Sequence, residues 1–208
     1  MFLKTVLRII RSLLFVDRCV VCHDEGSVLH TDCVAHFAVT PPHRLSWIHS
    51  VWHYQDPAVK DLIYILKKKA DTDILETCLQ NISSPFSSDY HIVIPIPASP
   101  DRMRQYGFNQ AYLLAKQFVV HNPAYQLCDA LMHTDTPSTK QALVSDRSQR
   151  LQNKKGCFTI KESYAALLSD KHIIVIDDVS TTGATLIEAR RALAHAAPAS
   201  IQAWTLGH

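Results

Sequence analysis

The chain has 208 residues, of which 47% are hydrophobic and 19% charged, and its formal net charge at pH 7 is +2. This length holds one ordinary domain plus a small appendage, and the near-neutral charge gives no indication of a nucleic-acid partner. Three of the six cysteines gather near the amino terminus and the others are scattered singly. That distribution is unlike a secreted disulfide framework and favours a reducing cytoplasm as the location.

The amino-terminal segment has the pattern of a basic amphipathic helix. Over residues 2–15, apolar residues recur at helical spacing, and Lys4, Arg8 and Arg11 lie on the opposite face. These charges interrupt the run before the roughly 20 apolar residues that a membrane span needs, and Arg11 breaks the apolar region of a signal peptide. We expect a helix that packs on its own domain, with membrane contact as the less favoured alternative.

A cluster of metal-binding residues follows this segment. Cys19 and Cys22 precede Cys33 and His36 in the pattern C-x₂-C-x₁₀-C-x₂-H. Three thiolates and one imidazole make the closed tetrahedral set of a structural zinc site, in which no position stays open for catalysis. So small a knuckle would depend on its metal for folding. The alternatives are a thioredoxin-like redox pair and, for the fourth ligand, His23 and His30.

A pair of prolines marks the first boundary in the chain. Pro41 and Pro42 indicate a linker out of the knuckle. We therefore divide the chain into residues 1–42, with the amphipathic helix and the zinc knuckle, and residues 43–208, a single larger domain.

The larger domain begins with one strand and two helices. Residues 47–54 have the alternation of a strand, and residues 57–66 have helical periodicity. Three lysines, residues 67–69, end this helix, where they complement the negative end of the helix dipole. Contact with a phosphate or a nucleic acid is the alternative role for these lysines. A second helix follows, capped by Asp71 or Thr72.

Residues 91–97 form the next predicted strand, which prolines terminate. An arginine-bearing loop follows, and a helix begins near the block Gly107-Phe108-Asn109-Gln110. Arg102 and Arg104 in this loop are planar donors suited to phosphate oxygens. An ordinary surface position is the alternative for Arg104.

The segment of residues 134–150 has few apolar residues and no clear period, and it carries Lys140, Arg147 and Arg150. Long irregular loops in compact domains are usually lids or disordered segments. We expect a basic lid here. A further strand follows it near Phe158, and residues 200–206 form the last strand.

The most informative stretch is residues 173–185, with the sequence IIVIDDVSTTGAT. Its first four residues are apolar and β-branched, which predicts a strand buried on both faces. Asp177 and Asp178 therefore lie at the carboxyl end of this strand. Small, hydroxylated and glycine residues follow, and helical periodicity begins at Leu186. The pattern is a strand, a tight loop and a helix.

Such a loop presents backbone N–H groups at the positive end of a helix dipole, so a phosphate monoester fits there. The two aspartates would instead accept hydrogen bonds from sugar hydroxyls or hold Mg²⁺. Together these features suit a ribose 5-phosphate. An ordinary strand-to-helix turn is the alternative. The predicted phosphate-binding residues are Val179, Ser180, Thr181, Thr182, Gly183, Ala184 and Thr185.

These residues resemble the phosphoribosyl pyrophosphate motif of type I phosphoribosyltransferases, and nearly the whole chain resembles the ComF family of competence-type, phosphoribosyltransferase-like proteins. Two departures are evident: Tyr106 stands where the family usually has Arg, and His36 where it usually has Cys. The other blocks that carry the resemblance are the knuckle, Leu66-Lys67, Pro95-Ile96-Pro97, Gly107-Phe108-Asn109-Gln110, Gln141-Ala142-Leu143, Arg150 with Asn153, Gly156 and Phe158.

The resemblance implies an α/β fold: a type I phosphoribosyltransferase-like parallel sheet flanked by helices, with a small N-terminal zinc knuckle and the ligand at the carboxyl ends of the strands. It implies that Asp177, Asp178 and Arg102 take part in catalysis, and that the loop after the strand of residues 91–97 holds pyrophosphate. The remaining residues implied to bind phosphoribosyl pyrophosphate are Lys67, Pro97, Ala98, Arg104 and Arg150. It also implies a role linked to the uptake of single-stranded DNA in competent bacteria.

The leading hypothesis is a cytoplasmic protein that binds phosphoribosyl pyrophosphate with Mg²⁺ and transfers or senses the phosphoribosyl group. The basic lid would then close over pyrophosphate and exclude water. One alternative is a competence protein that binds single-stranded DNA and keeps a non-catalytic site, since zinc knuckles do bind single strands. The other is a nucleobase salvage enzyme. The DNA-uptake machinery is a further candidate partner, and no motif identifies the acceptor.

Overall fold

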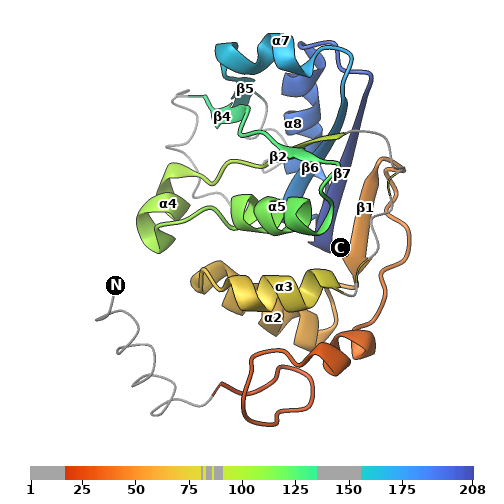
Figure 1. The fold of residues 1–208 in the computed structure, drawn as a ribbon, viewed down its shortest axis with the longest axis vertical. Coiled ribbons are helices and arrows are strands. Elements are labelled where there is room, and N and C mark those ends of the chain that lie inside the picture. The colour runs from red at the N-terminus through yellow and green to blue at the C-terminus, as the bar shows by residue number, and fades with distance from the viewer. Residues whose placement is uncertain (1–16, 81, 83–85, 87–90, 135–155) are drawn as a thin grey trace.

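The structure is a computed structural model that describes residues 17–80, 82, 86, 91–134 and 156–208 (Figure 1). The predicted amphipathic helix lies outside the described residues, and so do Arg150 and nearly all of the predicted basic lid. Among the helices of the described part, none has the length and apolar character that crossing a membrane requires.

A five-stranded sheet forms the centre of the molecule, and all of its strand pairs are parallel. The predicted strand at residues 173–176 is confirmed as the buried part of the middle strand, where all four residues have no exposed surface. In sheet order the strands are β1 (Ile48–Trp52), β7 (Ser200–Gly207), β6 (His172–Val179), β2 (His91–Pro95) and β3 (Gln126–Leu127).

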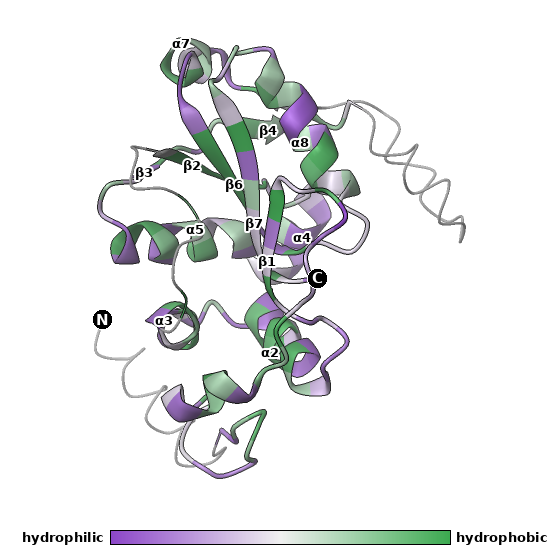
Figure 2. Cartoon of the chain, turned by 90° about the vertical axis from the view of Figure 1, so that its right-hand side faces the viewer, coloured by the Kyte–Doolittle hydropathy of each residue, from purple (hydrophilic) through white to green (hydrophobic). Residues whose placement is uncertain are grey.

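Helices cover both faces of this sheet, so β6 has a hydrophobic core on either side. Ile174 and Ile176 pack in one core with residues of α2 (Pro57–Lys68), α3 (Thr72–Gln80) and α5 (Gln110–His121). Ile173 and Val175 pack in the other core with α8 (Ala184–Ala194). Because successive side chains of a strand point to opposite faces, a continuous apolar run is needed here, and green stretches mark it on β2 and β6 in Figure 2.

The helices on either side of the lysine run begin where the sequence predicts. The Asp56 side chain accepts a hydrogen bond from the backbone N–H of Ala58, which caps α2 one residue before its proline. Asp71 caps α3, since its carboxylate accepts from the backbone N–H groups of Asp73 and Ile74.

The predicted arginine-bearing loop is wrong in one respect, because most of it is the helix α4 (Pro100–Tyr106). The Ser99 hydroxyl caps this helix by accepting from the backbone N–H of Arg102 at 3.3 Å. Gly107 ends it in the left-handed conformation, with φ of 76°. Arg102 and Arg104 therefore lie on a short helix, and the helix geometry sets the direction in which each side chain points.

A second, small sheet lies at the end of the molecule near α8. It pairs β4 (Leu131–His133) with β5 (Phe158–Ile160) in antiparallel fashion. Glu188 of α8 accepts from the backbone N–H of Gly156 at 2.8 Å, just before β5. The remaining short helices are η3 (Glu162–Tyr164) and α7 (Ala165–Leu168).

The cysteine-rich segment packs against the main domain. Val28, Leu29, Val34 and Phe37 are buried in the same core as α2 and α3. Val34 lies in the 3₁₀ helix η1 (Thr31–His36), and the Asp17 carboxylate adds an ion pair with Lys69 at 2.9 Å. The fold of the knuckle and the packing of these two helices are therefore energetically linked.

Candidate functional site

A cavity of about 130 Å³ lies at the carboxyl ends of β2 and β6. Its position follows from the strand register, in which Pro95, the last residue of β2, lies beside Ile176. The chain of β6 continues past that point, so Asp177 and Asp178 reach beyond the end of their neighbour. The cavity brings together six of the predicted site residues: Asp177, Asp178, Lys67, Pro97, Ala98 and Arg102.

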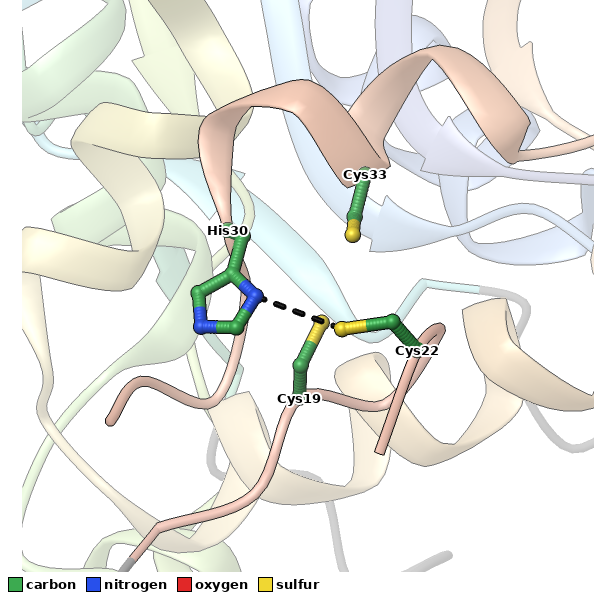
Figure 3. Close-up of side chains that lie close together, drawn as sticks. All are labelled: Cys19, Cys22, His30 and Cys33. Carbon is green, nitrogen blue, oxygen red and sulfur yellow. Dashed lines mark hydrogen bonds between the residues drawn. The ribbon is translucent and has the colours of Figure 1, made fainter. Parts of the chain in front are cut away.

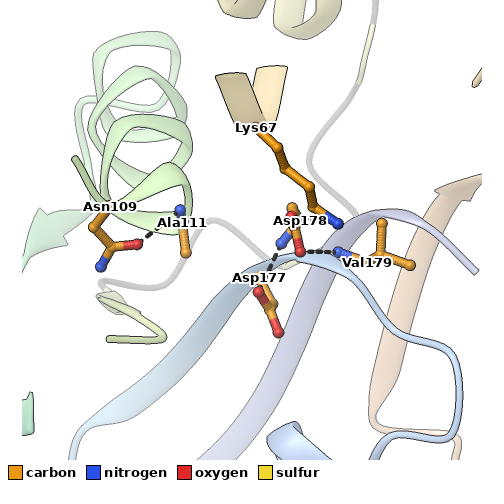
Figure 4. Close-up of polar contacts among 6 residues, drawn as sticks. All are labelled: Lys67, Asn109, Ala111, Asp177, Asp178 and Val179. Carbon is orange, nitrogen blue, oxygen red and sulfur yellow. Dashed lines mark hydrogen bonds and ion pairs between the residues drawn. The ribbon is translucent and has the colours of Figure 1, made fainter. Parts of the chain in front are cut away.

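The two carboxylates are held by their own backbone and by one lysine (Figure 4). Asp178 is 5% exposed, and its Oδ2 lies 3.1 Å from Lys67 Nζ. Its Oδ1 accepts from the backbone N–H of Val179 at 2.8 Å. Asp177 in turn accepts from the backbone N–H of Asp178 at 2.9 Å. These bonds fix two adjacent acids at one edge of the sheet before any ligand arrives.

Asp178 has a cationic partner at short distance, Lys67, and among the described residues Asp177 has none. Burial and the neighbouring Asp178 carboxylate raise the pKa of Asp177 to about 8, although the Arg102 charge works in the opposite direction. In the absence of ligand, Asp177 therefore binds a proton near neutral pH. A bound cation would favour its ionised form.

This raised pKa predicts a stability effect of Asp177→Asn. The folded protein binds the Asp177 proton more tightly than the unfolded chain, so stability falls as pH rises from about 4 to about 8. Asparagine keeps the acceptor and removes the buried charge. In thermal unfolding without ligand, we expect the variant to melt about 2–6 °C above the original protein at pH 8.5 and close to it at pH 5.

Asp178→Asn is the matched control for this measurement. It makes the same chemical change one residue away but leaves Lys67 without its carboxylate partner, so its melting temperature should not rise at pH 8.5. A melting temperature of Asp177→Asn that stays at or below that of the original protein at pH 8.5 would contradict the assignment.

The two arginines of α4 differ in position. Arg102 lines the cavity, near enough to Asp177 to affect its pKa. Arg104 forms an exposed ion pair with Asp101 on the same helix and is not among the residues that line the cavity. Tyr106, at the position where the ComF family usually has Arg, does line it. The structure thus gives the two arginines unequal access to a ligand.

The hydroxyl-rich loop follows β6 at the same edge of the sheet. The backbone N–H of Ser180 donates to the carbonyl of Gly207 at 2.9 Å, which ties the start of the loop to β7. Gly183, with φ of 76°, turns the chain into α8. A Cβ on this glycine would lie 3.1 Å from Leu45 Cδ1, and the left-handed backbone favours glycine here.

The exposed side of this loop is formed by its threonines. Thr181 is exposed, and Thr182, Ala184 and Thr185 are partly exposed. Arg44 donates to the carbonyl of Thr182 at 3.2 Å. As the described residues define it, the cavity at Asp177 and Asp178 does not extend over residues 179–185. The loop is an adjacent surface, and its role as a phosphate cradle stays a prediction.

The cavity also contains residues that were not predicted as site residues. Two of them, Asn109 and Gln110, belong to the block Gly107-Phe108-Asn109-Gln110, which the sequence marks as a helix start and as part of the family resemblance. Asn109 caps α5 by accepting from the backbone N–H of Ala111, and its amide donates to the carbonyl of Ile96. This anchors α5 against the end of β2. The unpredicted cavity residues with polar side chains are Gln105, Tyr106, Asn109 and Gln110.

The amino-terminal cluster is a set of three cysteines and one histidine: Cys19, Cys22, His30 and Cys33 (Figure 3). Their candidate ligand atoms all lie within 4.8 Å of one another, and Cys22 Sγ is 3.3 Å from His30 Nδ1. Zinc–sulfur bonds of about 2.3 Å would place tetrahedral ligands roughly 3.8 Å apart. The cluster therefore fits a zinc knuckle.

The predicted fourth ligand, His36, does not belong to this cluster, and His30 takes its place. A backbone bond from Val20 N–H to the carbonyl of Val28, 3.0 Å long, folds the segment back so that His30 reaches Cys22. His36 is exposed in the last turn of η1, three residues after Cys33. At about 2 Å rise per residue, it lies roughly 6 Å further along the helix axis.

The thiols of the cluster have strongly unequal proton affinities. Burial would raise the pKa of the Cys19 thiol, but the backbone groups of Cys22, His30 and Val21 together lower it to about 6. Burial and the two neighbouring thiols raise the pKa of Cys33 to about 12. Thiols that are crowded in this way repel one another once ionised, and a shared cation would relieve that repulsion.

Comparison with known proteins agrees with this arrangement. A model of the phosphoribosyl transferase domain matches residues 107–206. Competence protein ComFC of Bacillus subtilis is 32% identical over 164 residues, which cover 76% of this chain and 62% of that protein. Competence protein ComFC of Streptococcus pneumoniae is 29% identical over 72% of this chain and 63% of that protein.

Competence protein F of Haemophilus influenzae is 30% identical over 55% of this chain and 48% of that protein. The chain thus spans less than two thirds of the length of these relatives. The domain match covers β6, the aspartates and the hydroxyl-rich loop. Together with the parallel sheet and the Cys₃His cluster, these matches support a ComF-type protein with a phosphoribosyltransferase-like domain.

Proposed function

We propose that the chain binds phosphoribosyl pyrophosphate with Mg²⁺ and transfers or senses its phosphoribosyl group. One observation carries the proposal: two adjacent carboxylates, a lysine and an arginine line a single cavity, at the edge of the sheet where a hydroxyl-rich loop opens a helix. The ligand has the complementary groups, with ribose hydroxyls that donate to carboxylates and phosphates that accept from cations and backbone N–H groups.

In this proposal Asp177 and Asp178 accept hydrogen bonds from the ribose hydroxyls and favour positive charge at the anomeric carbon. Residues 179–185 bind the 5-phosphate through backbone N–H groups and threonine hydroxyls. Arg102, with Pro97 and Ala98 beside it, takes the pyrophosphate. Mg²⁺, held by the same carboxylates, would supply charge neutralisation at the pyrophosphate.

Lys67 has a separate part in this proposal. Its ammonium group lies 3.1 Å from Asp178 Oδ2, and both residues line the cavity. It can therefore reach a phosphate oxygen while it neutralises the carboxylate. A zinc ion at the amino-terminal cluster would be structural, since its four protein ligands leave no open position.

For the biological role we propose a ComF-like part in DNA uptake, because relatives of this chain are named competence proteins. Direct binding of single-stranded DNA by the lysine run is less favoured, since each of its lysines has a partner within the chain. Lys67 pairs with Asp178, Lys68 contacts the Tyr64 ring, and Lys69 pairs with Asp17.

Isothermal titration calorimetry of phosphoribosyl pyrophosphate tests the proposed function. With Mg²⁺ present we expect saturable binding of one ligand per chain, and much weaker binding without it. Arg102→Ala should weaken this binding about 10–100-fold, because a charge-assisted bond to phosphate is worth roughly 1.5–3 kcal/mol. Arg104→Ala is the matched control on the same helix and should change the affinity by less than about threefold.

Two results would contradict the proposal. Absence of binding heat at ligand concentrations well above those of the cell would remove the function itself. If Arg104→Ala lowers the affinity for phosphoribosyl pyrophosphate more than Arg102→Ala does, the pyrophosphate does not bind on the cavity side of α4.

A further inference from the structure

A buried pair of polar side chains lies behind the hydroxyl-rich loop. His43 is 7% exposed and Ser180 is 3% exposed, and His43 Nε2 lies 3.5 Å from Ser180 Oγ. The two residues are far apart in the sequence, because His43 opens the larger domain and Ser180 is the first residue after β6. The pair therefore joins the start of this domain to the loop that is predicted to bind phosphate.

Every polar group of Ser180 has a partner within the protein. Its backbone N–H donates to the carbonyl of Gly207 at 2.9 Å, and its own carbonyl oxygen lies 2.6 Å from His208 Nδ1. Because a carbonyl only accepts, His208 Nδ1 carries the hydrogen of this bond. The His208 ring also lies against the His43 ring, with centroids 4.2 Å apart. Ser180 is thus held from two sides, by residues at the end of β7 and by His43.

The hydrogen bonds of the His43 ring show which nitrogen carries its hydrogen. The backbone N–H of Leu45 donates to Nδ1 at 3.0 Å, so Nδ1 is an acceptor. Burial, followed by the neighbouring His208 and Arg44, lowers the pKa of His43, so the ring is neutral at pH 7. The single hydrogen of the neutral ring is therefore on Nε2, which donates to Ser180 Oγ in a long hydrogen bond.

The two residues after His43 contact the same loop. Arg44 donates to the carbonyl of Thr182 at 3.2 Å. A Cβ on Gly183 would lie 3.1 Å from Leu45 Cδ1 and 3.6 Å from His43 Cε1, so both side chains lie directly against this glycine. Together with His43, these residues pack behind the loop where the chain turns from β6 into α8.

We propose that His43 is a positioning residue for phosphate binding: its Nε2–H bond to Ser180 holds the hydroxyl-rich loop in the form that binds a phosphate monoester. This inference deepens the proposed function and rests on it, because it assigns the support of the 5-phosphate site to a residue behind that site. His43 is not itself a ligand of the phosphate. A loop that is held in place before the ligand arrives loses less conformational freedom on binding, which raises the affinity.

Two probes, each with one part of the proposed ligand, test this role by calorimetry on the full chain. Ribose 5-phosphate has the 5-phosphate and no pyrophosphate, whereas inorganic pyrophosphate with Mg²⁺ should use the cavity side with Arg102. We expect His43→Phe, which keeps a ring and loses both hydrogen bonds, to weaken the binding of ribose 5-phosphate about tenfold. Its affinity for pyrophosphate should change by less than about twofold. A tenfold loss corresponds to a loop that is in the binding form about a tenth of the time.

Three further variants separate positioning from general damage to the fold. His43→Gln keeps a donor for Ser180, so it should bind ribose 5-phosphate within about threefold of the original protein. Ser180→Ala removes the acceptor and should cause the same loss as His43→Phe, with no further loss in the double variant. His172→Phe is the matched control, because it breaks a histidine–serine contact of 2.8 Å, to Ser200, at the opposite end of β6. It should leave both affinities unchanged.

Hydrogen exchange without ligand tests the same bond independently of the proposed function. Bonded backbone N–H groups mark the two ends of the loop: that of Ser180 donates to Gly207, and that of Ile187 donates to Gly183 at 2.8 Å. In His43→Phe we expect both to exchange at least about fivefold faster than in the original protein, because the loop opens more often. His172→Phe should leave their exchange rates unchanged.

The outcomes separate this inference from the proposed function. If His43→Phe binds ribose 5-phosphate as the original protein does, or loses affinity for both probes equally, the inference is overturned even where phosphoribosyl pyrophosphate binds. A further loss of affinity in the double variant would make Ser180 a direct ligand and would also overturn it. If the original protein binds neither phosphoribosyl pyrophosphate nor ribose 5-phosphate, the proposed function fails. Faster exchange in His43→Phe then still supports His43 as the residue that holds the loop, and unchanged exchange overturns that role.

Discussion

Replacing both aspartates by asparagine, Asp177→Asn with Asp178→Asn, is expected to reduce the affinity for phosphoribosyl pyrophosphate with Mg²⁺ by at least about 100-fold. Each hydrogen bond from a hydroxyl to a buried carboxylate is worth roughly 1.5–3 kcal/mol, and the double variant weakens two of them. It also removes the charges that attract Mg²⁺ to the cavity. Calorimetry with and without Mg²⁺ measures the loss.

The folded state of this variant needs a separate check, because Lys67 loses its carboxylate partner at Asp178. A melting curve and the far-ultraviolet circular dichroism spectrum supply that check. A double variant at two exposed ion-paired positions outside the cavity, Asp101→Asn with Asp129→Asn, makes the same charge change and should bind as the original protein does. Unchanged affinity in the Asp177 and Asp178 variant would remove the ribose assignment.

Loss of His30 is expected to empty the zinc knuckle, whereas loss of His36 is not. The purified chain should contain about one equivalent of zinc, His30→Ala should hold much less, and His36→Ala should keep it. Structural zinc contributes on the order of 10 kcal/mol to the folding of small knuckles. Because Val34 and Phe37 share the core of α2 and α3, we expect His30→Ala to lower the melting temperature by more than about 5 °C.

Metal analysis by plasma emission, together with melting curves, measures both effects. The His36→Ala variant is the matched control, since it removes an imidazole three residues after Cys33 on an exposed turn. Zinc loss with His36→Ala and retention with His30→Ala would restore the ligand set predicted from spacing. Absence of zinc from the original protein would refute the knuckle.

The sequence predicts the centre of the fold because its signals there are local and strong. Four consecutive β-branched residues at 173–176 favour a buried strand, and the acids, small residues and glycine that follow indicate where the strand ends and the helix begins. The position of the aspartates at the sheet edge follows directly from this order. Whether the aspartates approach Lys67 and Arg102 depends on packing between elements far apart in the sequence. The family resemblance implies this packing, but the periodicity of the sequence does not predict it.

The features that sequence reasoning missed have weak or competing signals. β3 and β4 have two and three residues, too few for any periodicity to appear. The helix α4 has a signal in Ser99-Pro100 and Gly107, which supply a cap, a first-turn proline and a terminating glycine, but only about two turns of helix lie between them. Because the segment contains two arginines, the sequence favoured a phosphate-binding loop over a helix.

The fourth ligand of the knuckle and the amide of Gln110 were missed for a different reason. Spacing favours His36, which follows Cys33 in the pattern C-x₂-H, but the backbone bond between Val20 and Val28 brings His30 to the cysteines instead. Gln110 is a helix-start residue by sequence, and its burial in the cavity without a hydrogen-bond partner among the described residues is a property of the packed structure. Neither can be read from residue order.

A crystal structure of the full chain with Mg²⁺ and phosphoribosyl pyrophosphate tests the central claim most directly. Our account predicts density for the ribose with its hydroxyls within hydrogen-bond distance of Asp177 and Asp178, and for the 5-phosphate on the backbone N–H groups of residues 179–185. Ligand density elsewhere on the molecule, or the aspartates still paired only within the protein under a saturating ligand, would contradict it.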